Sequence, residues 1–164
     1  MVFGRSGHVS LPYRPNVGIL LLSVYNLLWV GERIDLPGAW QMPQGGMEPG
    51  ETIEEAFFRE AGEELGLGRD FLQILDVSEK PLRYEFPLHV MRRQPNNQYR
   101  GQEQHWVVAR FLGRDSDINI HTAEPEFSNW RWVTASQLMD LVVPFKRGTY
   151  SKVLKEFRHL VLPG

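Results

Sequence analysis

A stretch of twenty-three residues, 45–67, contains seven glutamates and a single arginine. If residues 53–65 form a helix, Glu60, Glu63 and Glu64 stand three and four positions apart and share one face. Like charges at this spacing destabilise a helix by ~0.2–0.5 kcal/mol per pair, so the arrangement favours a compensating cation. Carboxylate oxygens are the ligands that Mg²⁺ and Mn²⁺ prefer. The spacing therefore predicts a site for a hard divalent ion.

Other residues of this stretch bear on that interpretation. Arg59 is placed to reach back to Glu51 near the helix start, and such a pair would fix the preceding turn against the helix. Gly62 lies mid-helix, where glycine costs ~1 kcal/mol relative to alanine. It indicates either close approach by a backbone or ligand, or a tolerated defect. The alternative to a metal site is a solvated acidic face, which describes Glu54 and Glu55 best.

The helix that carries these carboxylates has clear boundaries in the sequence. Thr52 is a good N-cap residue, and Glu55 completes a capping box with it. Gly66 is placed to end the helix in a left-handed conformation. Apolar residues four positions apart predict the face that packs on the core: Ile53, Phe57, Ala61 and Leu65.

The rest of the chain alternates apolar runs with turn signals. Runs rich in branched and aromatic residues predict strands at 17–24, 26–34, 71–77, 82–86, 104–112 and 129–133. Helical patterns cover 135–142 and 146–161, and the polar stretch 91–102 predicts a surface loop. Because strands and helices mix without strict alternation, we expect an α+β fold or a mixed sheet between helices.

Composition narrows the class of protein. The 164 residues fit one domain, which we place at 13–164 after an N-terminal arm at 1–12. A formal charge of -2 excludes a polycation, so a phosphate-rich partner must meet a local basic patch. No cysteine is present, which excludes disulfides and thiol chemistry and fits a reducing compartment. We expect no membrane partner, no DNA partner and a cytoplasmic location, or an organellar one if a targeting peptide has been removed.

The acidic stretch resembles the Nudix box. That pattern runs Gly, five residues, Glu, seven residues, Arg-Glu, an apolar residue, any residue, Glu-Glu, any residue, Gly and an apolar residue. Nine residues of this chain fill its fixed positions: Gly45, Glu51, Arg59, Glu60, Ala61, Glu63, Glu64, Gly66 and Leu67. Nine constrained positions in twenty-three residues make the resemblance highly specific, although Ala61 is smaller than the usual aliphatic residue.

The resemblance implies a Nudix-type α/β/α sandwich, with a mixed sheet between helices, and a loop–helix–loop that binds metal. It makes Glu60, Glu63 and Glu64 the ligands of two or more Mg²⁺ or Mn²⁺ ions, with Gly45, Glu51 and Arg59 as supporting residues. A general base or further ligand often lies outside the box. Here Glu126 is the candidate, with Glu124 as its competitor and an ordinary surface glutamate as the alternative.

Similarity to one group of the family extends beyond the box. The segments YRPNVGI, WQMPQGG, GQEQHWVVARF, INI, PEFSNWRWV and VPFKRGTYSKVLKEF look like those of bacterial RNA pyrophosphohydrolases and of diadenosine polyphosphate hydrolases from bacteria and plants. They span residues 13–157, nearly the whole chain. The resemblance therefore implies cleavage of a polyphosphate chain attached to a 5′-nucleoside.

Several residues in these segments suit contacts with phosphate or base: Arg14, Arg33, Gln44, Tyr84, Gln104, Phe145, Lys146 and Arg147. An aromatic residue beside two cations, as at 145–147, suits base stacking and phosphate capture. The alternatives without a role in binding are a structural aromatic on a strand for Tyr84 and a solvated helix start for Lys146 and Arg147. Cations are unfavourable at a helix N-terminus, which favours a functional role.

The expected reaction is metal-dependent attack of water within a polyphosphate. On 5′-triphosphorylated RNA it leaves a 5′-monophosphate, and on diadenosine tetraphosphate it gives ATP and AMP. Two alternatives stay open: hydrolysis of ADP-ribose or a sugar nucleotide, and a non-catalytic nucleotide-binding regulator. The choice between RNA ends and dinucleotides, the metal used and the oligomeric state are not fixed by the sequence.

Overall fold

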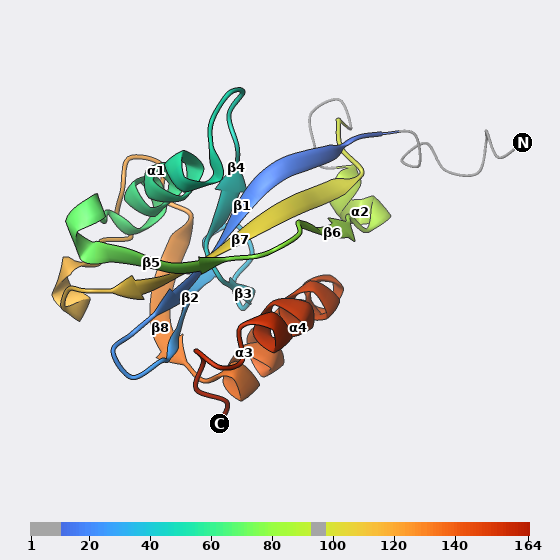
Figure 1. The fold of residues 1–164 in the computed structure, drawn as a ribbon. Coiled ribbons are helices and arrows are strands. Elements are labelled where there is room, and N and C mark those ends of the chain that lie inside the picture. The colour runs from blue at the N-terminus through green and yellow to red at the C-terminus, as the bar shows by residue number, and fades with distance from the viewer. Residues whose placement is uncertain (1–10, 93–97) are drawn as a thin grey trace, which may run out of the picture.

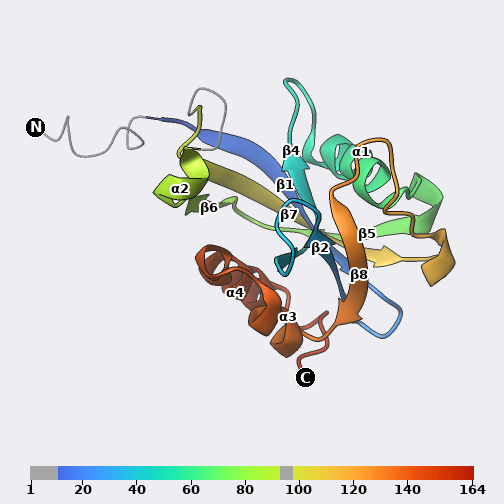
Figure 2. The same cartoon turned by 180° about the vertical axis from the view of Figure 1, so that it is seen from behind.

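A computed structural model describes residues 11–92 and 98–164 (Figures 1 and 2). The strands are β1 (Tyr13–Leu22), β2 (Leu28–Arg33), β3 (Trp40–Gln41), β4 (Gln44–Gly46), β5 (Leu72–Val77), β6 (Leu82–Glu85), β7 (Gly101–Phe111) and β8 (Phe127–Val133). The α-helices are α1 (Ile53–Leu65), α2 (Leu88–Met91), α3 (Ala135–Leu141) and α4 (Arg147–Glu156). Of the predicted arm at 1–12, all but the last two residues lie outside the described part of the chain.

All eight strands join one mixed sheet. Its main path runs β3-β2-β1-β7-β5, while β4 pairs with β1, β6 with β7 and β8 with β2. The central pair, β1 and β7, is parallel over its whole length, from Tyr13 opposite Gly101 to Leu22 opposite Arg110. The other strand pairs are antiparallel. Helix α1 covers one face of the sheet, and α3 and α4 cover the other (Figures 1 and 2).

The central strands are apolar on both faces because each face meets a helix layer. Alternate residues of β1 point to opposite sides. Val17, Ile19 and Leu21 join the core under α1, whereas Leu20 and Leu22 join the core under α3 and α4. The continuous apolar run at the start of the chain thus supplies two cores. The predicted α+β fold with a sheet between helix layers is confirmed.

The largest departure from the predicted elements is at β4. The sequence patterns predict no strand at residues 44–46, but the segment pairs antiparallel with β1, with Gly45 opposite Val17. Glycine is depleted in strands, so neither glycine of this segment signals one. The pairing fixes Gln44, Gly45 and Gly46 beside the first strand.

Other boundaries also differ from the predictions. Of the predicted loop at 91–102, residues 93–97 lie outside the described residues, and the rest includes the end of α2 and the first two residues of β7. The predicted helix at 146–161 is a 3-10 turn followed by α4, which ends at Glu156. Beyond it the chain turns, so that Phe157 and Val161 stay buried while Leu162 donates a backbone hydrogen bond to Asn26.

Within the described residues, no helix has the length and apolar character needed to cross a bilayer.

Candidate active site

A large cleft, of about 1300 Å³, lies between the sheet and α1. Side chains from β1, β2, β4, α1, the loop at 122–126 and the turn before α4 line it. The carboxylates of α1 form one wall, and cations with aromatic residues form another.

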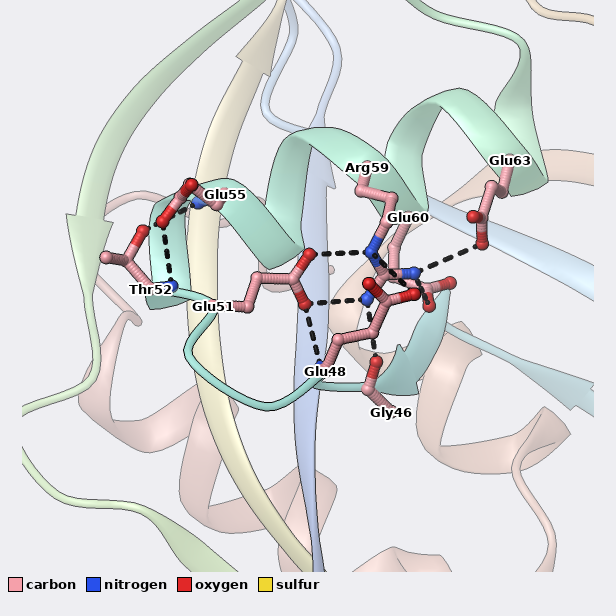
Figure 3. Close-up of polar contacts among 8 residues, drawn as sticks. All are labelled: Gly46, Glu48, Glu51, Thr52, Glu55, Arg59, Glu60 and Glu63. Atoms are coloured by element: carbon pink, nitrogen blue, oxygen red, sulfur yellow. Dashed lines mark hydrogen bonds and ion pairs between the residues drawn. The ribbon is translucent and has the colours of Figure 1, made fainter.

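Helix α1 is fixed at both ends by its own sequence. The Thr52 hydroxyl accepts a hydrogen bond from the backbone N–H of Glu55, and the Glu55 carboxylate accepts one from that of Thr52 (Figure 3). Gly66 ends the helix with φ 66°. The predicted capping box and C-terminal glycine are both confirmed. The carboxylates that follow are thus presented from a rigid element.

Arg59 is the centre of the polar contacts on α1 (Figure 3). Its guanidinium pairs with both oxygens of Glu51 at 2.7 and 2.8 Å, and it donates to the carbonyl of Gly46 at 2.8 Å. It also bonds Glu60 at 2.9 Å and Glu63 at 3.2 Å. The predicted Arg59–Glu51 pair is confirmed, and it ties the glycine turn to the helix. Arg59 holds the pKa of Glu51 at about 2, below its ordinary value of 4.5.

The glycines of β4 allow the carboxylates to approach the sheet. A Cβ added at Gly45 would overlap the Glu60 carboxylate, and one at Gly46 would overlap the Arg14 guanidinium. A side chain at either position would force Glu60 or Arg14 to move from its present place. Their backbone places an acidic and a basic side chain on neighbouring parts of the cleft.

The three central carboxylates differ in burial. Glu60 and Glu64 are each only 7% exposed, whereas Glu63 is exposed. Helical spacing alone would leave Glu64 on an exposed face, but β4 and the loop at 119–126 lie against that side of α1. Burial raises the pKa of Glu64 well above its ordinary value, and the charges of Glu60 and Glu126 raise it further. Burial also raises the pKa of Glu60, which Arg59 partly offsets.

This donor set suits a hard cation chemically. One carboxylate oxygen of Glu64, Oε2, is buried and has no hydrogen-bond partner among the described residues, and a buried acceptor of this kind is costly unless it is satisfied. A divalent ion bound to the oxygens of these clustered carboxylates would offset their mutual repulsion. Glu60, Glu63 and Glu64 could hold such an ion. Among residues 11–92 and 98–164, however, no three acidic or histidine side chains converge as ready ligands, because Arg59 occupies oxygens of Glu60 and Glu63.

Both candidate glutamates outside the helix reach the cleft. Glu124 and Glu126 are exposed and line it, next to the loop residues Thr122 and Ala123. The charge of Glu126 lies near enough to Glu64 to raise its pKa. This proximity favours Glu126 over Glu124 as the carboxylate that works with the helix.

The opposite wall is built around Lys146. Its side chain is 3% exposed, and its ammonium donates to Gln41 at 2.8 Å and to Gln44 at 3.5 Å. Burial, followed by the nearby charge of Arg33, lowers the pKa of Lys146 to about 7. The alternative of a solvated helix start is therefore wrong for Lys146. A buried cation held by two amide oxygens is placed to meet an anion entering the cleft.

An aromatic pair lies beside this lysine. The rings of Tyr84 and Phe145 are 5.9 Å apart between centroids, and the Lys146 ammonium is about equally distant from each, at 6.0 and 5.9 Å. Tyr84 is buried, which raises its pKa to about 12, and its hydroxyl accepts from Gln44 at 3.4 Å. Phe145 is half-buried. The two rings are tilted by 51° to each other and present an apolar surface next to a cation.

Six of the eight predicted substrate-contacting residues line the cleft: Arg14, Arg33, Gln44, Tyr84, Phe145 and Lys146. Gln104 does not. It is fully buried behind the wall, where its amide donates to Asn16 at 2.9 Å and to Gln44 at 3.0 Å. Arg147 is exposed on the first turn of α4 and is not part of the lining. Both were therefore misplaced as contacts: Gln104 is buried against its partners Asn16 and Gln44, and Arg147 lies outside the lining.

Several residues of the cleft were not anticipated: Asn16, Gln41, Phe58, Arg69, Phe86 and Gln102. The two amides of β7 stand two positions apart, so the strand alternation alone puts Gln102 on the same side as Gln104. No local signal points to Phe58 and Arg69, which are brought to the cleft by the packing of α1 against the turn after it.

Comparison with known proteins decides the family. The model of the NUDIX domain matches residues 12–156 of the chain. The protein belongs to the Nudix hydrolase family. Nudix hydrolases typically depend on divalent metal ions, which agrees with the carboxylate wall of this enzyme.

Relatives of known activity match over nearly the whole length of this Nudix hydrolase. An RNA pyrophosphohydrolase from Erythrobacter litoralis is 45% identical, over 98% of this chain and 100% of that protein. Another, from Sphingopyxis alaskensis, is 44% identical over 94% of this chain and 98% of that protein. Among solved structures, the E. coli dihydroneopterin triphosphate pyrophosphohydrolase superposes with a TM-score of 0.67 and 18% identity, over 88% of this chain and 99% of that one. That similarity establishes the fold alone.

Proposed function

We propose that this Nudix hydrolase is an RNA pyrophosphohydrolase that removes pyrophosphate from 5′-triphosphorylated RNA and leaves a 5′-monophosphate. One observation carries the proposal: a single cleft joins buried carboxylates on α1 to a buried lysine and an aromatic pair. A triphosphate attached to a nucleoside would match this order, with its phosphates at the metal-binding carboxylates and the lysine and its base at the aromatic pair. The full-length similarity to RNA pyrophosphohydrolases at 44–45% identity supports the same substrate.

Different residues of the cleft would bind the phosphates and the bases of the substrate. Arg14, Arg33 and Lys146 would bind phosphate oxygens, and Phe145 and Tyr84 would stack on the first bases. Gln44 lies between the walls and bonds both Tyr84 and Lys146, so it would set the distance between base and phosphate. A near-neutral protein of formal charge -2 gives little long-range attraction to RNA, so we expect recognition to be confined to the first nucleotides.

The carboxylates would hold the metal ions. We assign Glu60, Glu63, Glu64 and Glu126 as ligands of Mg²⁺ or Mn²⁺, two or more ions per site, with Gly45, Glu51 and Arg59 as supports. Bound divalent ions would neutralise phosphate charge and lower the pKa of a coordinated water. Glu126, exposed at the edge of the cleft, would accept a proton from the attacking water. Water adds to phosphorus, the bond to the bridging oxygen breaks, and pyrophosphate leaves.

The same walls would accept a dinucleoside polyphosphate, because it too is a polyphosphate on a 5′-nucleoside. We therefore include diadenosine tetraphosphate as a second substrate, giving ATP and AMP. The absence of cysteine fits action in a reducing cytoplasm.

A substrate panel tests the proposal. Purified protein with Mg²⁺ is given 5′-triphosphorylated RNA, diadenosine tetraphosphate and ADP-ribose in parallel, and the released phosphates are quantified. We expect turnover of the RNA and the dinucleotide, with Glu64→Gln as the inactive control. Faster turnover of ADP-ribose would replace the proposal by the sugar-nucleotide alternative. Binding of all three without any phosphate or pyrophosphate release would favour a non-catalytic regulator.

A further inference from the structure

The cleft continues past the carboxylates of α1. Beyond them it is lined by Phe58, Gly62, Arg69, Thr122 and Ala123, which the proposed reaction on RNA does not use. The whole cleft measures about 1300 Å³, above the ~300–1000 Å³ of ordinary small-molecule sites. One nucleoside with its phosphates therefore leaves room at this second end.

The second end contains a flat platform made by Phe58 and Arg69. The guanidinium carbon of Arg69 lies 4.0 Å from the centroid of the Phe58 ring. Phe58 in turn packs edge-on against the buried Phe57 at 4.9 Å with an interplanar angle of 69°, which ties the platform to the core. Arg69 is exposed and lines the cleft. Guanidinium planes and aromatic rings are the groups on which proteins stack nucleobases.

The path between platform and carboxylates is open. Gly62 lies one helical turn after Phe58 and directly before Glu63, and a Cβ there would meet only the Leu67 carbonyl oxygen, at 3.8 Å. The backbone needs no glycine for its own packing at this position. The hydroxyl of Thr122, across the cleft, is buried without a hydrogen-bond partner in the described residues. A group with its own hydroxyls or ring nitrogens would satisfy it.

We propose that the Phe58–Arg69 platform binds the base of the second nucleoside of a dinucleoside polyphosphate, the one on the far side of the carboxylates from Phe145. This inference rests on the proposed function, because it takes the Phe145 end as the site of the first nucleoside. A 5′-triphosphorylated RNA has only pyrophosphate on the far side, so the platform separates the two substrate classes. Removing it should weaken the dinucleotide and spare the RNA.

Steady-state kinetics of three variants test this separation. Phe58→Leu keeps apolar volume but removes the ring face, and Arg69→Gln removes the guanidinium from an exposed position. The matched control is Arg131→Gln, because Arg131 stacks on Trp40 at 4.2 Å in the same way but lies outside the cleft. Each variant is assayed with Mg²⁺ on diadenosine tetraphosphate and on 5′-triphosphorylated RNA.

We expect kcat/KM for the dinucleotide to fall about tenfold relative to that for RNA in Phe58→Leu and Arg69→Gln, and not in Arg131→Gln. Most of the fall should appear in KM. Equal losses of kcat/KM on both substrates, or no loss on the dinucleotide, would contradict the proposed role of the platform. Wild-type turnover of RNA without turnover of the dinucleotide would overturn it too.

A binding measurement separates the platform from the proposed function. If wild-type protein released no pyrophosphate from RNA, the proposed function would fall. Titration calorimetry with diadenosine tetraphosphate and Ca²⁺ would still report on the platform. Tighter binding by wild type than by Phe58→Leu and Arg69→Gln, with Arg131→Gln unchanged, supports the platform, and equal affinities refute it.

Discussion

Replacing Arg59 with methionine should destabilise the fold in a pH-dependent way. The side chain pairs with Glu51, Glu60 and Glu63 and bonds the carbonyl of Gly46, so methionine leaves these groups without their cation. The pKa of Glu51 stands at about 2 in the folded protein against an ordinary 4.5. At ~1.36 kcal/mol per pH unit this difference amounts to at most about 3 kcal/mol. Because the Arg59 side chain is 23% exposed, solvent screens the pair, and we expect a loss of about 2 kcal/mol at pH 7.

The sign of the pH dependence follows from the lowered pKa. A carboxyl group whose pKa falls on folding stabilises the protein fully above its unfolded pKa of 4.5, and that stabilisation is lost as pH falls toward about 2. At pH 3 roughly half of it remains in the wild type. Glu60 also makes the stability deficit smaller at low pH. Burial raises its pKa, so Glu60 takes up a proton more readily once Arg59 is gone. The deficit of Arg59→Met should therefore shrink from about 2 to about 1 kcal/mol between pH 7 and pH 3.

Urea unfolding followed by tryptophan fluorescence at both pH values measures this deficit, because Trp29 and Trp106 are fully buried. Arg59→Lys serves as the comparison variant. It keeps the charge but loses the planar fork that meets Glu51 with two hydrogen bonds, so an intermediate deficit is expected. A deficit below about 0.5 kcal/mol at pH 7, or one that is the same at both pH values, would refute the reasoning.

Four further predictions concern single residues. Glu64→Gln should lower kcat by about a hundredfold or more without lowering the melting temperature, because the amide is cheaper to bury than the carboxylate; activity near wild type in the RNA assay would show that the carboxylate is not needed. Phe145→Ala should raise KM for RNA about tenfold with little change in kcat, and an unchanged KM would reduce the ring to a packing role. Gln104→Met should raise KM about fivefold at constant kcat, because Gln44 loses the amide that orients it, and should cost about 1–3 kcal/mol in urea unfolding; a normal KM would contradict this positioning role. Gly62→Ala should raise stability by ~1 kcal/mol and the melting temperature by about 2–4 °C in a thermal scan, and a lower melting temperature would mean that a side chain does not fit there.

The local features of the site were predictable because they depend on helical spacing. The capping box of Thr52, the glycine cap at 66 and the pair between Arg59 and Glu51 all join residues within eight positions of one another. Their geometry follows once α1 forms. The Nudix pattern added the roles of these residues, and the family match agrees with it.

What could not be predicted depends on contacts between distant segments. Lys146 is buried because Gln41 and Gln44, more than a hundred positions earlier, meet its ammonium. Glu64 is buried because the glycine-rich β4 pairs with β1 and closes one side of the helix, and glycines in a strand leave no pattern. Gln104 turns inward to hold Gln44, which the alternation of β7 permits but does not require.

The parallel pairing of β1 with β7 has a consequence for synthesis of the chain. The two strands register over ten residue pairs, and their side chains meet where Gln104 bonds Asn16 across 88 positions. A ribosome adding roughly 5–20 residues per second leaves the first strand without this neighbour for about 4–18 seconds. During that interval β1, an apolar strand, has one unpaired edge. Such an edge can bind chaperones or pair with the wrong strand. The cleft is completed later still, because its lining extends to Lys146, and no polypeptide released before that residue can possess it.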